Sequence, residues 1–346
     1  MKHLKKISYF LVLIMALTLL AGCSKNKIPD EPISKTSIVI GTVCTITLYD
    51  SDDATIIDKA FARLSELEDI LSINKTGTEL DKVNEMAGKS PVKVSKDTLN
   101  VVKKGLEYSA LSNGALDITV GPLVKLWGIG TEHAKVPSQD EINTAKNLIN
   151  YKDVVINEDE STIYLEKPNM IIDLGAIAKG YAADEIVKIL KDNDVNSAII
   201  NLGGNIFALG EKIDGNPWKV GIQTPNEDRN STIGYVSVKN KSIVTSGVYE
   251  RYFEEDGKKY HHILSPETGY PYENEILGVS IISDDSIDGD SLSTTLFALG
   301  VEKGLELVES TKGIDAIFIT KDNKLYMSDG FKKIFTLTNT DYTIVE

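Results

Sequence analysis

The sequence predicts an α+β fold with mainly antiparallel sheets and packed helices. Several segments have the pattern of β-hairpins, in which two short runs of β-branched residues flank a turn. The amphipathic helical segments do not alternate regularly with strands, as they would in a doubly wound parallel sheet. The chain has 346 residues, enough to bury one large core or two fused lobes.

Residues 1–22 have the layout of a secretory signal. Three lysines precede a thirteen-residue apolar run, which is shorter than the roughly 20 residues of a membrane-spanning helix. The run ends in Leu-Ala-Gly-Cys, which resembles a bacterial lipobox, so Cys23 would be lipidated and become the first mature residue. The alternative is an uncleaved anchor in which Cys23 is a passive thiol. Both interpretations place the protein on the extracytoplasmic face of the cell membrane.

A folded domain is expected over residues 36–346. Residues 23–35 contain the lipidated cysteine and a polar segment with two prolines, which predicts a tether. Residues 36–49 are rich in β-branched side chains and predict a long strand or a strand pair.

Three helices are predicted in the first half of this domain. Ser95 is expected to cap a helix over 95–109, and a capping box beginning at Ser138 opens another. In the helix predicted over 53–71, one stripe is apolar and consists of Ile57, Phe61, Leu64, Leu67 and Leu71.

From residue 154 onward, strands dominate the prediction. Hairpins are expected at 154–165 and 251–264, the second with Asp256-Gly257 at its turn. Helices are expected at 178–190 and 291–309. Further strands are predicted at 196–210, 218–223, 232–238, 276–283, 313–320 and 323–329.

The charge of the chain excludes one class of partner. The formal net charge is −14, so a basic surface for a phosphate backbone is missing and a nucleic-acid partner is not expected. Apart from Cys23, the chain contains one cysteine, Cys44. A single cysteine cannot form an internal disulfide, and no cysteine cluster indicates zinc.

Familiar catalytic motifs are missing from the sequence. It has no Walker loop, no Gly-x-Gly-x-x-Gly after a strand and no Gly-x-Ser-x-Gly elbow. The chain contains four histidines in total, so a metal site built from several histidines is not expected.

Asp290 and Thr294 form a candidate magnesium site. They are four residues apart at the expected start of a helix, so their side chains share one face. Carboxylate and hydroxyl oxygens are ligands suited to Mg²⁺, which also keeps waters and substrate phosphate oxygens. The alternative is structural, with Asp288 or Asp290 as a helix N-cap and Thr294 as an ordinary helix residue.

The segment 170–186 contains a candidate phosphate site. Asp173 follows a predicted buried strand, Gly175 and Ala176 permit close approach of a ligand to the backbone, and Lys179 supplies a positive charge. Together with the N–H groups of a helix N-terminus, these residues suit a phosphate or pyrophosphate with its metal. The alternative is that Asp173 caps the helix and Lys179 is solvated.

Two further stretches offer polar groups. The small residues 245–247 are expected to form a turn that donates hydroxyl and backbone hydrogens. His262 precedes a Pro-Glu-Thr-Gly turn and is a candidate base or phosphate contact. It could equally be an ordinary strand residue.

Six motifs in chain order resemble the ApbE family of flavin transferases: GALDITVGPL, DLGAIAKGYAADEI, NLGGNI, TSGVYER, HHILSPETGYP and DGDSLSTTLFALG. The resemblance covers nearly all of the mature chain. It implies two fused T-fold-like lobes in a lipid-anchored, extracytoplasmic enzyme. Such an enzyme moves FMN from FAD onto a Thr hydroxyl of an acceptor protein with Mg²⁺ and releases AMP. The implied acceptors resemble flavin-carrying subunits of ion-pumping oxidoreductases, modified at a short Asp…Ser/Thr-Gly-Ala-Thr sequence.

The resemblance also implies residue roles. Mg²⁺ would be held by the side chains of Asp290 and Thr294 and by the carbonyl of Ala176, and His262 is the candidate base. The FAD site would be lined by Ile40, Asn74, Ala115, Leu116, Asp117, Asp173, Lys179 and Ile263.

Three positions depart from the family pattern. Ile40 stands where Met is frequent, Asn74 where an aromatic residue is common, and Ser265 where Asp is usual. The change at Asn74 bears on the balance between transfer and hydrolysis. The rival functions are therefore Mg²⁺-dependent hydrolysis of FAD to FMN and AMP, and capture of a flavin by a lipoprotein without catalysis.

Overall fold

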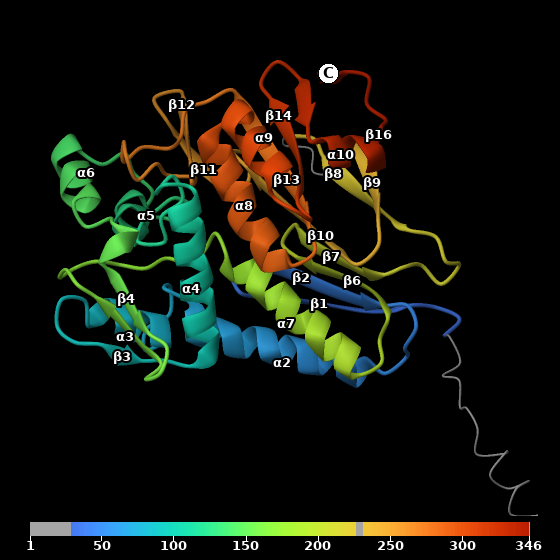
Figure 1. Cartoon of the computed structure of the whole chain (residues 1–346), viewed down its shortest axis with the longest axis horizontal. Coiled ribbons are helices and arrows are strands. Elements are labelled where there is room, and N and C mark those ends of the chain that lie inside the picture. The colour runs from blue at the N-terminus through green and yellow to red at the C-terminus, as the bar shows by residue number, and fades with distance from the viewer. Residues whose placement is uncertain (1–28, 226–230, 346) are drawn as a thin grey trace, which may run out of the picture.

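A nine-stranded sheet forms the centre of the computed structural model, which describes residues 29–225 and 231–345 (Figure 1). All but one of its neighbouring strand pairs are antiparallel. The predicted α+β class with mainly antiparallel sheets is confirmed.

The sheet consists of two similar halves. The first half contains, in spatial order, β1 (Ile33–Val39), β2 (Thr42–Leu48), β6 (Ser197–Leu202) and β7 (Asn205–Gly210). The second contains β10 (Lys241–Gly247), β13 (Ile276–Ser283), β14 (Asp315–Thr320) and β15 (Lys324–Met327), with β17 (Thr343–Ile344) beside β15 at the edge. In chain order each half has two strands, then helices, then two strands, as the expected two-lobed arrangement requires.

Helices cover one face of this sheet (Figure 1). They are α2 (Ala54–Leu71) and α7 (Ala178–Asp192) over the first half, and α8 (Ser286–Leu299) and α9 (Val301–Ser310) over the second. Under α2 and α7, the buried side chains of Cys44, Ile46 and Leu48 pack against the helices in the largest core cluster. The hydrophobic stripe predicted for the helix at 53–71 therefore faces the sheet.

A smaller sheet packs on the opposite face of the second half. It contains β8 (Trp218–Gln223), β9 (Thr232–Val238) and β16 (Phe335–Leu337), and α10 (Asp329–Ile334) lies beside it. Strand β14 shows the alternation that two covered faces require: Ala316 and Phe318 contact the α8–α9 core, whereas Ile317 and Ile319 contact the core beneath the small sheet.

A long insertion between α2 and α7 builds the left side of the molecule in Figure 1. It contains α3 (Glu79–Glu85), β3 (Val92–Lys93), α4 (Lys96–Leu111), α5 (Gly121–Trp127), α6 (Gln139–Lys146), the 3-10 turn η1 (Tyr151–Asp153), β4 (Val154–Asn157) and β5 (Thr162–Leu165). The hairpin of β11 (Tyr252–Glu255) and β12 (Lys258–His261) packs against it through the buried Trp127. Trp127 Nε1 also donates to the carbonyl of Gly269 at 2.8 Å.

The predicted helix starts in the first half are confirmed. Asp53 and Ser95 accept N-terminal N–H groups of α2 and α4, and Ser138 with Glu141 forms both bonds of a capping box at α6. Both predicted hairpins are present, and Asp256 and Gly257 have the positive φ values that a two-residue turn requires.

The single helix expected over 291–309 is a wrong prediction. Two helices occupy this region, separated at Gly300, whose φ is 83°. The first begins five residues earlier, at Ser286, because its N-terminal N–H groups are bound from another helix: the Asp184 carboxylate of α7 accepts from Ser286 N at 2.7 Å and Ile287 N at 2.9 Å. The turn expected at 245–247 is also wrong, because these residues form the last part of β10.

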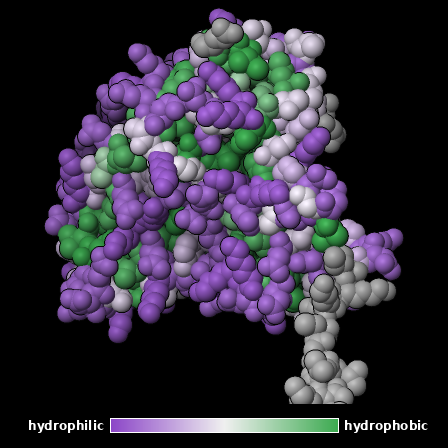
Figure 2. Space-filling view, turned by 45° about the vertical axis from the view of Figure 1, so that its right-hand side comes forward, coloured by the Kyte–Doolittle hydropathy of each residue, from purple (hydrophilic) through white to green (hydrophobic). Residues whose placement is uncertain are grey.

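The predicted signal and Cys23 lie outside the described residues. Among the residues that the structure does describe, no helix has the length and apolarity needed to cross a membrane. Figure 2 shows that hydrophilic side chains cover most of the visible face and that hydrophobic ones reach it in separate patches.

Candidate active site

A cavity of about 610 Å³ lies where the two halves of the sheet meet the insertion. This volume falls in the usual range for small-molecule sites. Ten of the predicted site residues line it together: Ala115, Leu116, Asp117, Asp173, Ala176, Lys179, His262, Ile263, Asp290 and Thr294. Segments far apart in the chain, from the insertion, α7, the β11–β12 region and α8, therefore meet at one place.

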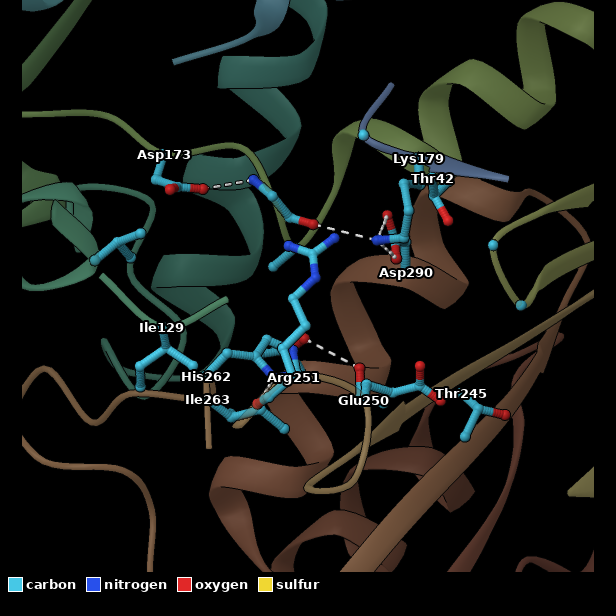
Figure 3. Close-up of a pocket in the computed structure, with 18 of the residues that line it drawn as sticks. Thr42, Ile129, Asp173, Lys179, Thr245, Glu250, Arg251, His262, Ile263 and Asp290 are labelled. Atoms are coloured by element: carbon cyan, nitrogen blue, oxygen red, sulfur yellow. Dashed lines mark hydrogen bonds and ion pairs between the residues drawn. The ribbon is translucent and has the colours of Figure 1, made fainter. Parts of the chain in front are cut away.

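Asp290 is a buried carboxylate at one end of the cavity. Its residue is 3% exposed, and it lies in the second turn of α8, so the alternative role as an N-cap is excluded. Its Oδ2 accepts from Gly180 N at 2.9 Å, and its Oδ1 lies 3.1 Å from Lys179 Nζ (Figure 3). The charge of Asp290 is thus partly compensated by a cation of the other lobe.

The Asp290 contact changes the first turn of α7. In a regular helix, the Gly180 N–H would bind the carbonyl four residues earlier, which is that of Ala176. Here the N–H donates to Asp290 instead, and no described residue donates a hydrogen bond to the Ala176 carbonyl. An oxygen ligand on the cavity wall is thereby left available beside the carboxylate.

Thr294 lies one turn after Asp290 on the same helix and lines the same cavity. Its hydroxyl has one hydrogen-bond contact, with Ser246 Oγ at 3.3 Å. Ser246 itself contacts Ser293 Oγ at 2.7 Å, and Ser293 donates to the Asp290 carbonyl at 2.8 Å. Ser246 comes from the 245–247 stretch, so these small residues do supply hydroxyl groups, although from a strand.

Asp173 occupies another part of the wall. Its Oδ1 accepts from Gly175 N at 2.7 Å, so it fixes the turn before α7 and does not cap the helix, whose N-cap is Ile177. Burial raises the pKa of Asp173, while the Gly175 N–H and the positive charges of Arg251 and Lys179 oppose this rise. The other carboxylate oxygen can accept a hydrogen bond from a ligand.

Asp117 lines the cavity, but its carboxylate is used within the loop. It accepts from Thr119 N at 2.8 Å, Thr119 Oγ1 at 2.6 Å and Tyr151 N at 3.0 Å. Burial raises the pKa of Asp117, and these three donors oppose the rise. The residue therefore shapes the loop at 115–119, and a ligand would meet mainly its backbone and those of its neighbours.

His262 has a defined tautomer. Its Nδ1 lies 3.2 Å from the Arg251 carbonyl, which can only accept, so the proton is on Nδ1 and the lone pair is on Nε2. Burial is the main cause that lowers the pKa of His262 to about 3, helped by the nearby positive charge of Arg251. The ring is therefore neutral at physiological pH and able to accept a proton or a hydrogen bond.

Arg251 is a site residue that the sequence reasoning missed. Figure 3 shows its guanidinium extending into the cavity toward the region between Asp173 and Lys179, with His262 and Ile129 on the side away from Asp290. Arg251 directly precedes β11. It belongs to the TSGVYER motif, but its spacing from other polar residues did not indicate that it lies in the site. A guanidinium that enters a cavity beside a lysine is suited to phosphate oxygens.

Two predicted site residues, Ile40 and Asn74, lie away from the wall. Ile40 sits at the β1–β2 turn with φ 50° and packs on the main core, while Gly41, Thr42 and Val43 after it line the cavity. Asn74 is exposed in the turn between α2 and α3 and is not among the lining residues. Ser265 is buried in the turn after His262, where its Oγ accepts from Thr268 N at 3.2 Å.

The oxygen groups of the cavity differ from those of a metal site in which protein side chains supply all the ligands. Among the described residues no group of three or more His, Cys, Asp or Glu side chains is arranged to hold a metal ion. One carboxylate, one hydroxyl and one free carbonyl instead fit Mg²⁺, which keeps waters and takes further oxygens from substrate phosphates.

The comparisons with known proteins agree with this geometry. A profile of the ApbE family matches residues 40–318. The chain is 38% identical to the FAD:protein FMN transferase of Klebsiella pneumoniae, over 90% of this chain and 97% of that protein. It is 37% identical to that of Treponema pallidum, over 86% and 87%. The solved structure titled flavin transferase ApbE from Vibrio cholerae matches with a TM-score of 0.80 at 30% identity, covering 88% of this chain and all of that one.

Proposed function

Since this chain belongs to the ApbE family and is an FAD:protein FMN transferase, we propose that it works with Mg²⁺, releases AMP and modifies a Thr hydroxyl of the acceptor. The observation that carries the metal proposal is the Gly180 N–H, which binds Asp290 and leaves the Ala176 carbonyl available. Asp290, Thr294 and that carbonyl would hold the ion. When bound, Mg²⁺ neutralises phosphate charge and stabilises the charge that develops on the leaving group.

The cations of the cavity would position the FAD pyrophosphate. Lys179 reaches the Gly175 carbonyl at 3.2 Å and Asp290 at 3.1 Å, so its ammonium already lies at the metal end. Arg251 extends into the cavity with a guanidinium that can bind two oxygens of one phosphate. The free oxygen of Asp173 can accept from a hydroxyl or N–H group of the nucleotide.

The transfer step is then a nucleophilic displacement at phosphorus. The acceptor Thr oxygen forms a bond to the flavin-side phosphorus, and the bond from that phosphorus to the bridging oxygen breaks. AMP leaves with the bridging oxygen and its electron pair. The hydroxyl proton would pass to Nε2 of His262, whose lone pair is free and whose Nδ1 proton is held by the Arg251 carbonyl.

We further propose that the enzyme is lipid-anchored through Cys23 on the extracytoplasmic face. Nine residues lie between Cys23 and Ile33, where β1 begins, and each of the ten steps of an extended chain spans at most about 3.3–3.6 Å. The domain would thus stay within roughly 35 Å of the lipid. Its acceptor would be a flavin-carrying subunit of an ion-pumping oxidoreductase in the same membrane.

Incubation of the protein with FAD and Mg²⁺ tests the proposal. The acceptor used is such a subunit with the Asp…Ser/Thr-Gly-Ala-Thr sequence, and its Thr→Val version is the control. Intact-mass analysis should find FMN on the first and not on the second, with AMP released in equal amount. AMP and free FMN without labelled acceptor would indicate a hydrolase instead. Unchanged FAD would indicate a binding lipoprotein.

A further inference from the structure

Two large apolar side chains are exposed together at the mouth of the cavity. Ile38 is 81% exposed and Val43 is 55% exposed, and they are direct cross-strand partners in the β1–β2 hairpin. The other strongly exposed large apolar residues of the described chain do not pair with one another in this way: Leu111, Val155, Ile213 and Ile344. Isolated apolar residues on a surface are normal, whereas a paired set beside a cavity indicates an interaction site.

This pair belongs to an open face of the sheet. Side chains alternate along β2, so Cys44, Ile46 and Leu48 enter the core and Val43, Thr45 and Thr47 point to the other side. The same alternation places Ser34, Thr36 and Ile38 of β1 on that side, where the Ser34–Thr47 and Thr36–Thr45 hydroxyl pairs are each 2.9 Å apart. The core beneath the small sheet includes Ala208, Ile206 and Ile199 of β7 and β6 but no residue of β1, and Ser34, Thr36 and Ile38 are exposed.

The open face runs directly into the cavity. Thr42, Val43 and Thr45 line it from β2. Figure 3 shows Thr42 on the Asp290 and Lys179 side of the cavity and away from His262. The opposite end is closed by the Trp127 core. A macromolecule would therefore reach the phosphate end of a bound FAD most directly across β1 and β2.

Strand β1 is also an edge strand. Within residues 29–225 and 231–345 it pairs with β2 alone, so its outer N–H and C=O groups are a template for another strand. The six side chains of the open face carry no charge: Ser34, Thr36, Ile38, Val43, Thr45 and Thr47. The chain has a net charge of −14, but this uncharged face would not repel an acidic segment. The expected acceptor sequence, Asp…Ser/Thr-Gly-Ala-Thr, contains such an acidic residue.

We propose that an extended segment of the acceptor protein docks along β1 as an added strand, with an apolar side chain on Ile38 and Val43. This inference rests on the proposed transfer function. Strand addition combines main-chain hydrogen bonds with contacts to alternate side chains. The chain turns at Ile40 and Gly41 into residues that line the cavity, so the modified hydroxyl would lie just beyond the added strand.

The kinetic test uses Ile38→Asp and Ile38→Lys, with Val155→Asp as a matched control on the exposed strand β4. The same acceptor subunit is the probe. Both Ile38 variants should raise KM for the acceptor about 10-fold, equivalent to about 1.4 kcal/mol, and leave acceptor-free AMP formation and FAD affinity unchanged. Val155→Asp should change none of these. An unchanged KM in both Ile38 variants would overturn the proposal, as would a KM that rises for Asp and falls for Lys, which indicates charge alone.

Hydrogen exchange of the β1 amides provides a test that needs no catalysis. Addition of the acceptor subunit should slow exchange of the outward β1 amides, those that do not bond to β2, and should not slow exchange in β4. If these outward amides are already protected in the free full-length protein, residues 1–28 or a second copy occupy the edge and the proposal fails. Protection without FMN transfer would reject the proposed function and retain the docking surface. Transfer without protection would retain the function and reject the docking surface.

Discussion

Replacement of Asp290 separates two roles that the structure gives to one carboxylate. Asn keeps an oxygen that accepts from the Gly180 N–H, but it removes the charge that faces Lys179 and the proposed metal. Ala removes both. We expect either variant to lower AMP formation at least about 100-fold, because electrostatic stabilisation at the transferred phosphate is the main catalytic contribution.

The two variants should differ in stability. Lys179 is 28% exposed at its side chain, so water can solvate its ammonium once the ion pair is lost. The Gly180 N–H is buried against Asp290, and an unsatisfied buried N–H costs about 1–3 kcal/mol unless the first turn of α7 rearranges so that this N–H binds the Ala176 carbonyl. Asp290→Ala should therefore unfold more easily than Asp290→Asn by about this amount.

AMP is measured by chromatography at saturating FAD and Mg²⁺, and stability by urea unfolding. Asp288→Asn is the matched control, because Asp288 lies on the same helix but binds Tyr108 and Lys104 and does not line the cavity. It should keep AMP formation. If Asp290→Asn turns over within about 3-fold of the unaltered enzyme, the metal assignment is refuted. Equal stability of the Asn and Ala variants would refute the role of the Gly180 bond.

Three other changes give distinct results. Cys23→Ala should leave an active enzyme without membrane partitioning, since acyl chains contribute about 0.8 kcal/mol per buried CH₂; acyl label on this variant would contradict the lipobox. Asn74→Tyr should leave FAD affinity and acceptor-free AMP release unchanged, because Asn74 is exposed in the turn between α2 and α3 and does not line the cavity; tighter FAD binding and less AMP release would instead indicate that a ring at this position stacks on the flavin, a contact of roughly 0.5–1.5 kcal/mol. The pKa of His262 is lowered to about 3 in the folded chain, so below about pH 6.5 the unfolded chain binds a proton that the folded chain does not, and stability falls as pH falls. His262→Gln should reduce the loss of unfolding free energy between pH 7 and pH 5 by about 1 kcal/mol, and urea titrations at both pH values would show whether it does.

Local patterns predicted those parts of the fold that local chemistry determines. The caps at Ser95 and Ser138 and the Asp256-Gly257 turn depend on residues within one turn of each other, and all three are present. The start of α8 could not be predicted in this way. Its cap is Asp184, more than a hundred residues earlier on α7, so only the packing of two helices reveals it.

The same limit applies to the site. Family motifs located the carboxylate at Asp290 and the loop at 173–179. No residue type in the sequence indicates that a backbone carbonyl is free of hydrogen bonds. Ala176 is available because a contact across the two lobes redirects the N–H of Gly180. Arg251 was missed for a related reason: its neighbours read as a strand, and only the folded chain shows that the side chain enters the cavity.

Gly180 lies at a close contact between α7 of one lobe and α8 of the other. A Cβ on this residue would lie 2.3 Å from the Ser286 carbonyl oxygen and 2.6 Å from Ile287 Cα, so α7 can approach the start of α8 this closely only because residue 180 has no side chain. Across this contact, the carbonyl comes from one lobe and the carboxylate and hydroxyl come from the other. Neither lobe contains all three proposed metal ligands. In a pair of identical lobes, each lobe would have needed both the glycine and the aspartate. If the chain arose by duplication of one unit, the proposed site formed only after the two copies had diverged, because each lobe now supplies groups that the other lobe lacks.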